Sequence, residues 1–215
     1  MSTGKSVAGL LAMFACVWSL QATATRIDLS PPLTNATAGN AFSVGVVISG
    51  LNGPAPPLAL TDFDLDISYN PSLLNALGVS FGTGLGNPPD ISGFNLSSVG
   101  IVDLFAVSFA NYATLRGLQG DSFTLATLTF RALAPGTDSL AFVSNGSFIV
   151  DLINAANQNP VNGANPANCG SRSCIDVGGA RVVIRSSVPE PNPLLLLGAA
   201  ALALAFARRA GKFSR

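Results

Sequence analysis

Charged and apolar residues alternate strictly between residues 62 and 69, and this alternation constrains the fold more than any other feature of the chain. The apolar positions are Phe63, Leu65, Ile67 and Tyr69, and the positions between them are Asp62, Asp64, Asp66 and Ser68. A period of two sends successive side chains to opposite faces of a β-strand. The segment is therefore predicted to be a half-buried strand, with Tyr69 packed inward and the Asp side chains on one face, about 7 Å apart.

Similar short segments recur through the body of the chain, and no amphipathic helical pattern of ten residues interrupts them. Strands are predicted at residues 42–49, 101–109, 121–132, 138–143, 147–153 and 179–186. The run 101–109 is apolar on both faces except at Asp103 and Ser108, which predicts a central place in a sheet. Together the segments predict an all-β fold, an antiparallel two-sheet sandwich of about nine strands.

Two breaks in these patterns predict irregular backbone. The apolar phase slips by one residue within 121–132, which predicts a β-bulge near Ala126 or Thr127. The turn Asn70-Pro71-Ser72 ends the strand at 62–69, since Asn and Pro favour turns. Residues 73–77 are then expected to form a single helical turn that Gly78 closes.

Residues 1–24 have the features of a secretory signal peptide. Lys5 precedes an apolar stretch from residue 7 to residue 20, and Ala22 and Ala24 supply the small residues of a signal-peptidase site. Cleavage is expected after Ala24, which places the exported domain at residues 25–187. Lipid attachment at Cys16 is the alternative, although the residues before it form a poor lipoprotein motif.

Residues 188–215 resemble a bacterial sorting signal called PEP-CTERM. Val188, Pro189, Glu190 and Pro191 are followed by an apolar segment, 194–207, and by a basic tail, 208–215, that contains Arg208 and Arg209. Basic residues beside a membrane segment stay in the cytoplasm, so the preceding chain is expected outside. The apolar helix would span only about 21 Å, short of a bilayer core. The resemblance implies transient insertion and cleavage by an exosortase; an unprocessed tail anchor is the alternative.

Two cysteines are left once the signal peptide is removed. Cys169 and Cys174 are expected to pair as a disulfide in an oxidising compartment, closing a short loop. They are too few ligands for a structural zinc site.

The charges of residues 25–187 exclude several function classes. This part has ten Asp and six Arg but no Lys, Glu or His, a net charge near −4. Without grouped basic residues, nucleic acid is not an expected partner. The absence of His removes the usual nucleophile systems, and no phosphate-binding or dinucleotide motif is present. The protein is expected not to be an enzyme and to need no cofactor.

Three segments resemble cohesin modules in order and spacing. Residues 63–74 are similar to the cohesin strand that ends in Tyr-Asp-Pro-x-x-Leu, with Asn70 in place of the Asp. Residues 38–40 match the glycine turn that precedes an alternating strand, and residues 120–136 match the penultimate region. The resemblance implies a jelly-roll sandwich of nine strands, related to carbohydrate-binding modules. It also implies a binding task, since cohesins usually clasp dockerin modules.

The polar side of the strand at 62–69 is the first candidate site. In cohesins this side contributes to the face that receives the partner, which implies that Asp62, Asp64 and Asp66 bind a dockerin-like protein. The alternatives are a merely solvated strand face, or a calcium site, although carboxylates along one strand do not converge on one ion.

Two further features allow contact with a polysaccharide. Tyr112 could stack on a sugar or pack at a loop tip, and the Asn-rich stretch from Asn154 to Cys174 could contact sugar hydroxyls or form a polar turn region. The overall expectation is an exported, exosortase-processed cell-surface or extracellular-matrix protein that binds a protein or polysaccharide. A purely structural matrix component and a carbohydrate-binding accessory module for polysaccharide breakdown are the alternatives.

Overall fold

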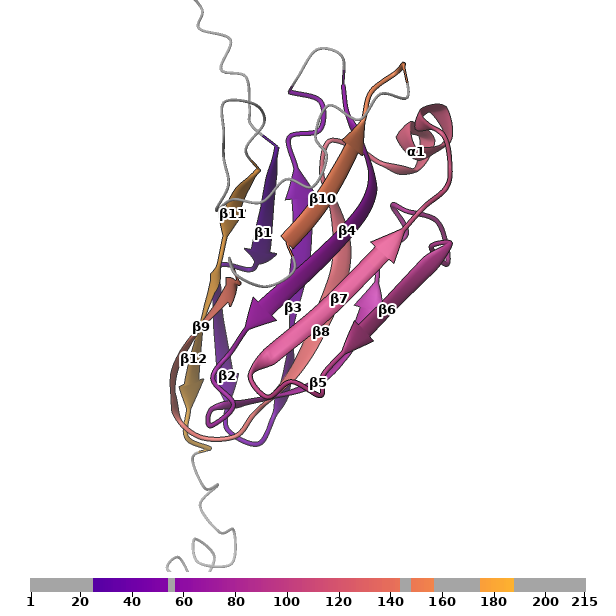
Figure 1. Ribbon diagram of the computed structural model, residues 1–215. Helices are drawn as coiled ribbons and strands as arrows, with labels where there is room; N and C mark the ends of the chain where they lie inside the picture. Colours follow the sequence, from indigo (N-terminus) through magenta and orange to yellow (C-terminus); the bar gives the residue numbers. More distant parts are fainter. Residues whose placement is uncertain (1–24, 54–56, 144–147, 157–174, 188–215) are drawn as a thin grey trace, which may run out of the picture.

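Two β-sheets packed face to face account for most of the chain whose structure is described (Figure 1). The computed structural model describes residues 25–53, 57–143, 148–156 and 175–187. The predicted signal peptide, the Cys169–Cys174 disulfide, the hydrophobic segment at 194–207 and most of the Asn-rich stretch lie outside these residues. Among the described residues, no helix is both long enough and apolar enough to cross a membrane.

The first sheet has five strands, which pair side by side in a fixed order. These are β11 (Asp176–Gly178), β1 (Arg26–Ser30), β3 (Ala41–Ser49), β8 (Phe123–Ala132) and β5 (Leu74–Phe81). The β1–β11 pair is parallel, and the other pairs are antiparallel.

The second sheet has seven strands. Its order is β2 (Leu33–Thr37), β12 (Ala180–Arg185), β9 (Gly136–Phe142), β4 (Ala59–Ser68), β7 (Ile101–Val107) and β6 (Ile91–Asn95). The seventh strand, β10 (Phe148–Ile153), pairs with the first part of β4, whereas β9 pairs only with its end. The strand predicted at 101–109 therefore lies between two others, as expected, but it ends at Val107.

The all-β sandwich prediction is confirmed, with two corrections. The described residues contain twelve strands rather than about nine, because five strands, β1, β2, β5, β6 and β11, were not among the predicted segments. The sheets are not wholly antiparallel either, because β2 and β12 pair in parallel like β1 and β11. Both parallel pairs join an N-terminal to a C-terminal strand. The segment between β1 and β2 and the segment between β11 and β12 cross from one sheet to the other side by side, and the N–H of Arg181 donates to the carbonyl of Pro32 at 2.8 Å.

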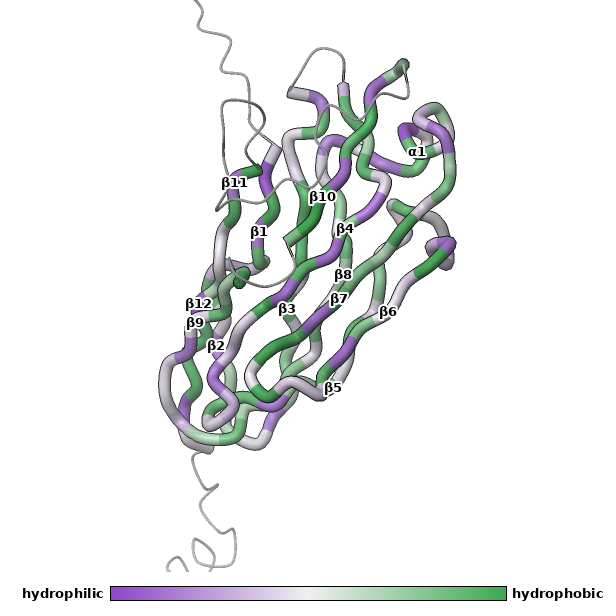
Figure 2. The backbone as a smooth tube through the Cα atoms, in the orientation of Figure 1, coloured by the Kyte–Doolittle hydropathy of each residue, from purple (hydrophilic) through white to green (hydrophobic). Residues whose placement is uncertain are grey.

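A single hydrophobic cluster fills the space between the sheets. Phe130 of β8 is fully buried, with its ring stacked on Phe42 at 5.8 Å and edge-on to Tyr69 at 5.5 Å between centroids. Tyr69 thus packs inward, as predicted. Figure 2 shows polar and apolar residues alternating along β4, which gives this strand one buried face. The cluster runs from Ile27 to Ile184, so residues 25–187 contain their own core.

The helical turn predicted at 73–77 is wrong, since β5 begins at Leu74 and continues through Gly78. The local pattern loses to tertiary pairing, because β5 pairs with β8 from Leu74 onward. Only the start of a turn survives, where the N–H groups of Leu73 and Leu74 both donate to the carbonyl of Asn70. The predicted turn at Asn70 is present, and the Asn70 side-chain oxygen accepts a hydrogen bond from the N–H of Ser72 at 2.9 Å.

The bulge predicted in the strand at 121–132 is present one residue earlier. Val46 pairs with Ala126 and Val47 with Thr124, so Leu125 is the extra residue of β8. Leu125 and Ala126 are both buried, although they are consecutive in the strand. The bulge thus accounts for the one-residue slip of the apolar pattern in the sequence.

A short helix, α1 (Tyr112–Leu118), was not predicted. Asn111 caps it, accepting from the N–H of Thr114 at 3.0 Å, and Leu115 is its buried residue. The buried side chain of Gln119 then bonds both backbone groups of Leu60, as acceptor at 2.8 Å and donor at 2.7 Å. These bonds hold the start of β4 in place.

Candidate partner-binding face

The outer face of the seven-stranded sheet carries the three predicted Asp side chains. Phe63, Leu65 and Ile67 are buried in the core, and the residues between them face outward and are partly exposed. Asp62, Asp64 and Asp66 therefore share one face of β4, as the alternation predicted.

Neighbouring strands add two more carboxylates to this face. Asp103 of β7 lies directly opposite Asp66, and Asp151 of β10 lies directly opposite Asp62. We call Asp62, Asp64, Asp66, Asp103 and Asp151 the acidic patch. Asp103 stands out in the sequence as the one charge in an apolar run, which is a weak signal. Nothing in the sequence marks Asp151 as a neighbour of Asp62, because the pairing joins residues 89 positions apart.

Exposed apolar side chains lie within the acidic patch. Phe105 of β7 and Ile149 of β10 are the two cross-strand neighbours of Asp64, and they are 37% and 42% exposed. The Phe105 ring covers Gly93 of β6, where a Cβ would lie 2.9 Å from the ring edge. Sequence reasoning missed both residues, since each follows the pattern of a buried strand. The face thus offers apolar contact area framed by carboxylates.

Burial raises the pKa of two of these carboxyl groups. For Asp62 partial burial is the main cause of a pKa above its usual range, and the charge of Asp151 adds to it. A hydrogen bond from the Thr61 hydroxyl to Asp62 Oδ2, at 3.0 Å, acts in the opposite direction. The pKa of Asp103 is raised by desolvation and then by the charges of Asp66 and Asp64. Like charges facing each other across strands destabilise a sheet.

The acidic patch is not built as a metal site. No group of three or more His, Cys, Asp or Glu in the described part of the chain is placed to hold a metal ion. Calcium is bound by about six to eight oxygen atoms around one centre, and carboxylates spread over three strands do not converge in this way. The calcium alternative therefore gains no support from the structure.

Tyr112 lies apart from the acidic patch, as the first residue of α1. Its ring is half-buried against the core, and its hydroxyl donates to the carbonyl of Pro57 at 3.1 Å. This position favours the packing alternative over sugar stacking.

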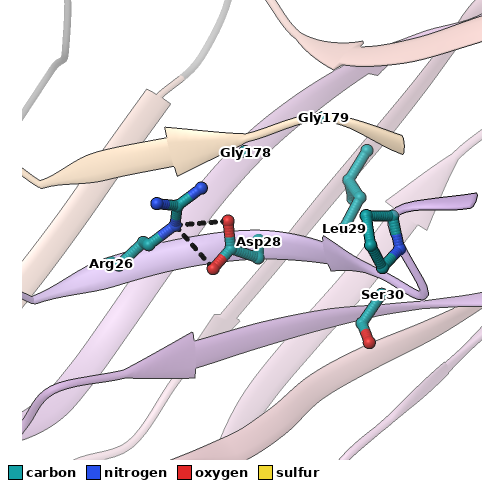
Figure 3. Close-up of a pocket in the computed structure, with 7 residues that line it drawn as sticks. Arg26, Asp28, Leu29, Ser30, Gly178 and Gly179 are labelled. Atoms are coloured by element: carbon teal, nitrogen blue, oxygen red, sulfur yellow. Dashed lines mark hydrogen bonds and ion pairs between the residues drawn. The ribbon is translucent and has the colours of Figure 1, made fainter. Parts of the chain in front are cut away.

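A cavity of about 290 Å³ lies beside the two segments that cross between the sheets, one after β1 and one after β11 (Figure 3). Arg26 Nε donates to both carboxylate oxygens of Asp28, at 2.6 and 2.7 Å, and this ion pair lies beside Gly178 and Gly179. A Cβ at Gly178 would overlap the Asp28 carboxylate, and one at Gly179 would lie 2.6 Å from the carbonyl oxygen of Leu140. The two glycines therefore allow the chain to pass close to its neighbours where it crosses between the sheets. The charged groups of this cavity satisfy each other, so it is not the better candidate site.

Comparisons with known proteins agree with both halves of the sequence analysis. Residues 187–209 match the PEP-CTERM protein-sorting motif. None of the curated proteins matches the sequence. The fold is similar to the seventh ScaB type I cohesin of Pseudobacteroides cellulosolvens, with 12% identity, a TM-score of 0.55, and coverage of 79% of this chain and 97% of that chain.

Two further solved structures show the same likeness. The Coh-OlpA-Doc918 cohesin–dockerin complex of Clostridium thermocellum matches with 14% identity and a TM-score of 0.55, covering 76% of this chain and 100% of that chain. CaCohA2 of Clostridium acetobutylicum matches with 18% identity and a TM-score of 0.54, covering 76% and 94%. The chain thus combines a cohesin-like sandwich with a C-terminal PEP-CTERM sorting motif.

Proposed function

We propose that this protein is exported, processed at its sorting motif by an exosortase, and held at the cell surface or in the extracellular matrix, where its sandwich binds a partner protein. The acidic patch, with Phe105 and Ile149 inside it, is the observation that carries the binding role. The proposal gives the sandwich no catalytic role, since the chain contains no His and no recognised catalytic motif.

The composition of the face indicates the chemistry of the partner. Apolar side chains at the centre of an interface supply most of the contact energy, and surrounding polar groups provide orientation. A cation reduces the repulsion between closely paired carboxylates. An Arg or Lys side chain of a partner would therefore form charge-assisted hydrogen bonds here. We therefore expect a partner segment with basic side chains around an apolar contact. A dockerin-like module is the first candidate, because one of the structurally similar cohesins was solved bound to a dockerin.

Binding is tested with purified residues 25–187 and a panel of dockerin modules by isothermal titration calorimetry. Asp64→Ala/Asp66→Ala should weaken binding at least tenfold, roughly, as expected for charged pairs at an interface. The matched control is Ser43→Ala/Thr129→Ala, a paired substitution on the outer face of the other sheet, which should bind like the wild type. Equal losses in both variants, or binding that ignores the Asp substitutions, would place the interface elsewhere. Binding to a glycan array instead would favour the carbohydrate-binding alternative.

Export is tested separately with the full chain in its source organism. Pro189→Ala/Glu190→Ala should leave a product that still carries residues 192–215 and stays in the membrane fraction. The wild type should appear at the surface, with Thr25 as its first residue if the signal peptide ends at Ala24. Wild-type protein that keeps an intact C-terminus at the surface would contradict exosortase processing.

A further inference from the structure

The outer face of the seven-stranded sheet also carries positive charge, on the side away from the acidic patch. Arg181 and Arg185 are exposed and alternate with buried residues of β12, so both point outward. We call them the basic patch. Their cross-strand neighbours are uncharged: Leu33 and Thr37 on β2, and Ser139 on β9. The one Asp of β9, Asp138, is buried and accepts from the N–H of Asn70 at 2.8 Å.

The acidic and basic patches cannot neutralise each other within one molecule. β9 lies between β12 and β4, so the basic patch is two strand spacings, about 10 Å, from the Asp side chains of β4 and further from Asp103. Asp151 of β10 lies on the β9 side of β4, but it sits opposite Asp62, away from the β4–β9 junction. Along the strands the separation grows, because β4 meets β9 only at Ile67 and Ser68. Accordingly, neither Arg181 nor Arg185 forms an ion pair with a described residue. One sheet face thus has an acidic side and a basic side with uncharged residues between them.

Such a face is complementary to itself. In a two-fold symmetric dimer, each surface patch meets a different patch of an identical surface, and every contact occurs twice. A two-fold axis near the β4–β9 junction would bring the basic patch of each copy to the acidic patch of the other. Exposed apolar residues lie on both sides, with Leu33 beside the basic patch and Phe105 and Ile149 within the acidic one. Apolar contacts would then accompany both charge pairings.

We propose that two copies of this chain associate through the outer faces of their seven-stranded sheets, with the basic patch of each against the acidic patch of the other. This inference goes beyond the proposed function. The dimer covers the acidic patch, so self-association and partner binding exclude each other. The acidic patch would therefore be covered in the dimer, and it would be accessible when a partner displaces the second copy.

The test is a charge exchange between two variants of residues 25–187, followed by sedimentation equilibrium at low and high salt. The wild type should dimerise at low salt and dissociate at high salt, because exposed ion pairs are screened. Arg181→Asp/Arg185→Asp makes both sides acidic, and Asp64→Arg/Asp66→Arg/Asp103→Arg turns the formal charge of the acidic patch from −5 to +1. Each variant alone should be monomeric. Mixed in equal amounts they should form a heterodimer, because each restores the charge that the other lost.

The control is Arg131→Asp, the same kind of charge reversal at one position on the outer face of the five-stranded sheet, which should leave the dimer intact. A wild type that stays monomeric at millimolar concentration and low salt overturns the inference, and so does a mixture that does not recover the dimer. All these residues face solvent, so circular dichroism should show folded variants. Arg181→Asp/Arg185→Asp keeps the acidic patch and should still bind a dockerin-like partner, which separates failure of the dimer from failure of the proposed function.

Discussion

The two sheets share one core but present very different outer faces. On the five-stranded sheet, cross-strand neighbours such as Ser43 and Thr129, or Gly45 and Thr127, are small and uncharged. On the seven-stranded sheet, Asp faces Asp in two places, and Phe105 and Ile149 are partly exposed. Both faces meet water, so solvation alone does not explain the difference.

Small, uncharged residues cover the middle of the five-stranded face, and the charged residues of that face lie on β1, on β11 and at the end of β8. We call this middle part, around Ser43 and Thr129, the neutral face. Facing carboxylates destabilise a sheet, and exposed apolar residues favour association. Such departures from the stable pattern concentrate at functional surfaces, where stability is given up for binding. This contrast is a further reason to propose the seven-stranded sheet as the binding face.

The largest effect should come from removing a side chain that supports both faces. Phe130→Ala deletes a fully buried ring between Phe42 and Tyr69 and should lower the free energy of unfolding by about 3–5 kcal/mol. Phe105→Ala, the matched change on the outer face, should cost less than about 1 kcal/mol. Urea titration measures both. Similar losses would mean that Phe105 belongs to the core and not to an exposed face.

A smaller effect is expected where the chain crosses from one sheet to the other. Gly179→Ala places a Cβ against the carbonyl of Leu140, a backbone atom that cannot swing aside, and should destabilise by about 1–3 kcal/mol. Gly78→Ala is the control, because a Cβ there meets nothing within 4 Å and Ala is favoured over Gly inside a strand. Thermal unfolding of the pair should shift in opposite directions or leave Gly78→Ala unchanged. Equal destabilisation would show that the crossing is not tightly packed.

Removing one charge from the acidic patch should stabilise the fold slightly. Asp103→Asn removes the repulsion between the carboxylates of Asp103 and Asp66, and it should raise the free energy of unfolding at pH 7 by about 0.2–1 kcal/mol. The reverse experiment puts an acidic pair on the neutral face with Ser43→Asp/Thr129→Asp, and stability should fall by a similar amount. If Asp103→Asn destabilised the protein, the carboxylate would be a structural group and the contrast between the faces would weaken.

The smallest effect concerns pH. Because the pKa of Asp62 and of Asp103 is raised in the folded state, the folded chain binds these protons more readily than the unfolded chain. The resulting stabilisation is complete below the ordinary value of 3.8 and is lost as the pH rises through the folded-state pKa. The stability advantage of Asp62→Asn/Asp103→Asn over the wild type should therefore shrink between pH 7 and pH 4. An advantage that grows on acidification would reverse the sign of this argument.

Sequence patterns located most of the long strands because a period of two is a local property. They also located the sorting motif, whose signal is an ordered run of residues. The errors have two causes, pairing with distant strands and elements too short to show a period. β5 follows a helical pattern but is held as a strand by β8, and α1 is too short to leave a clear period. The strands β1 and β11 are short, and they form through pairing with distant segments, β1 with β3 and β11 with β1.

By itself, the sequence determined that residues 62–68 belong to a strand with three Asp side chains on one face, and that a sorting motif follows the sandwich. Only the tertiary structure decided what lies beside those side chains. Asp103 and Asp151 join them, and Arg181 and Arg185 occupy the other side of the same face, through strand pairings between distant parts of the chain. Alternation sets which way a side chain points, whereas register and strand order set its neighbours, and these depend on how the whole core packs.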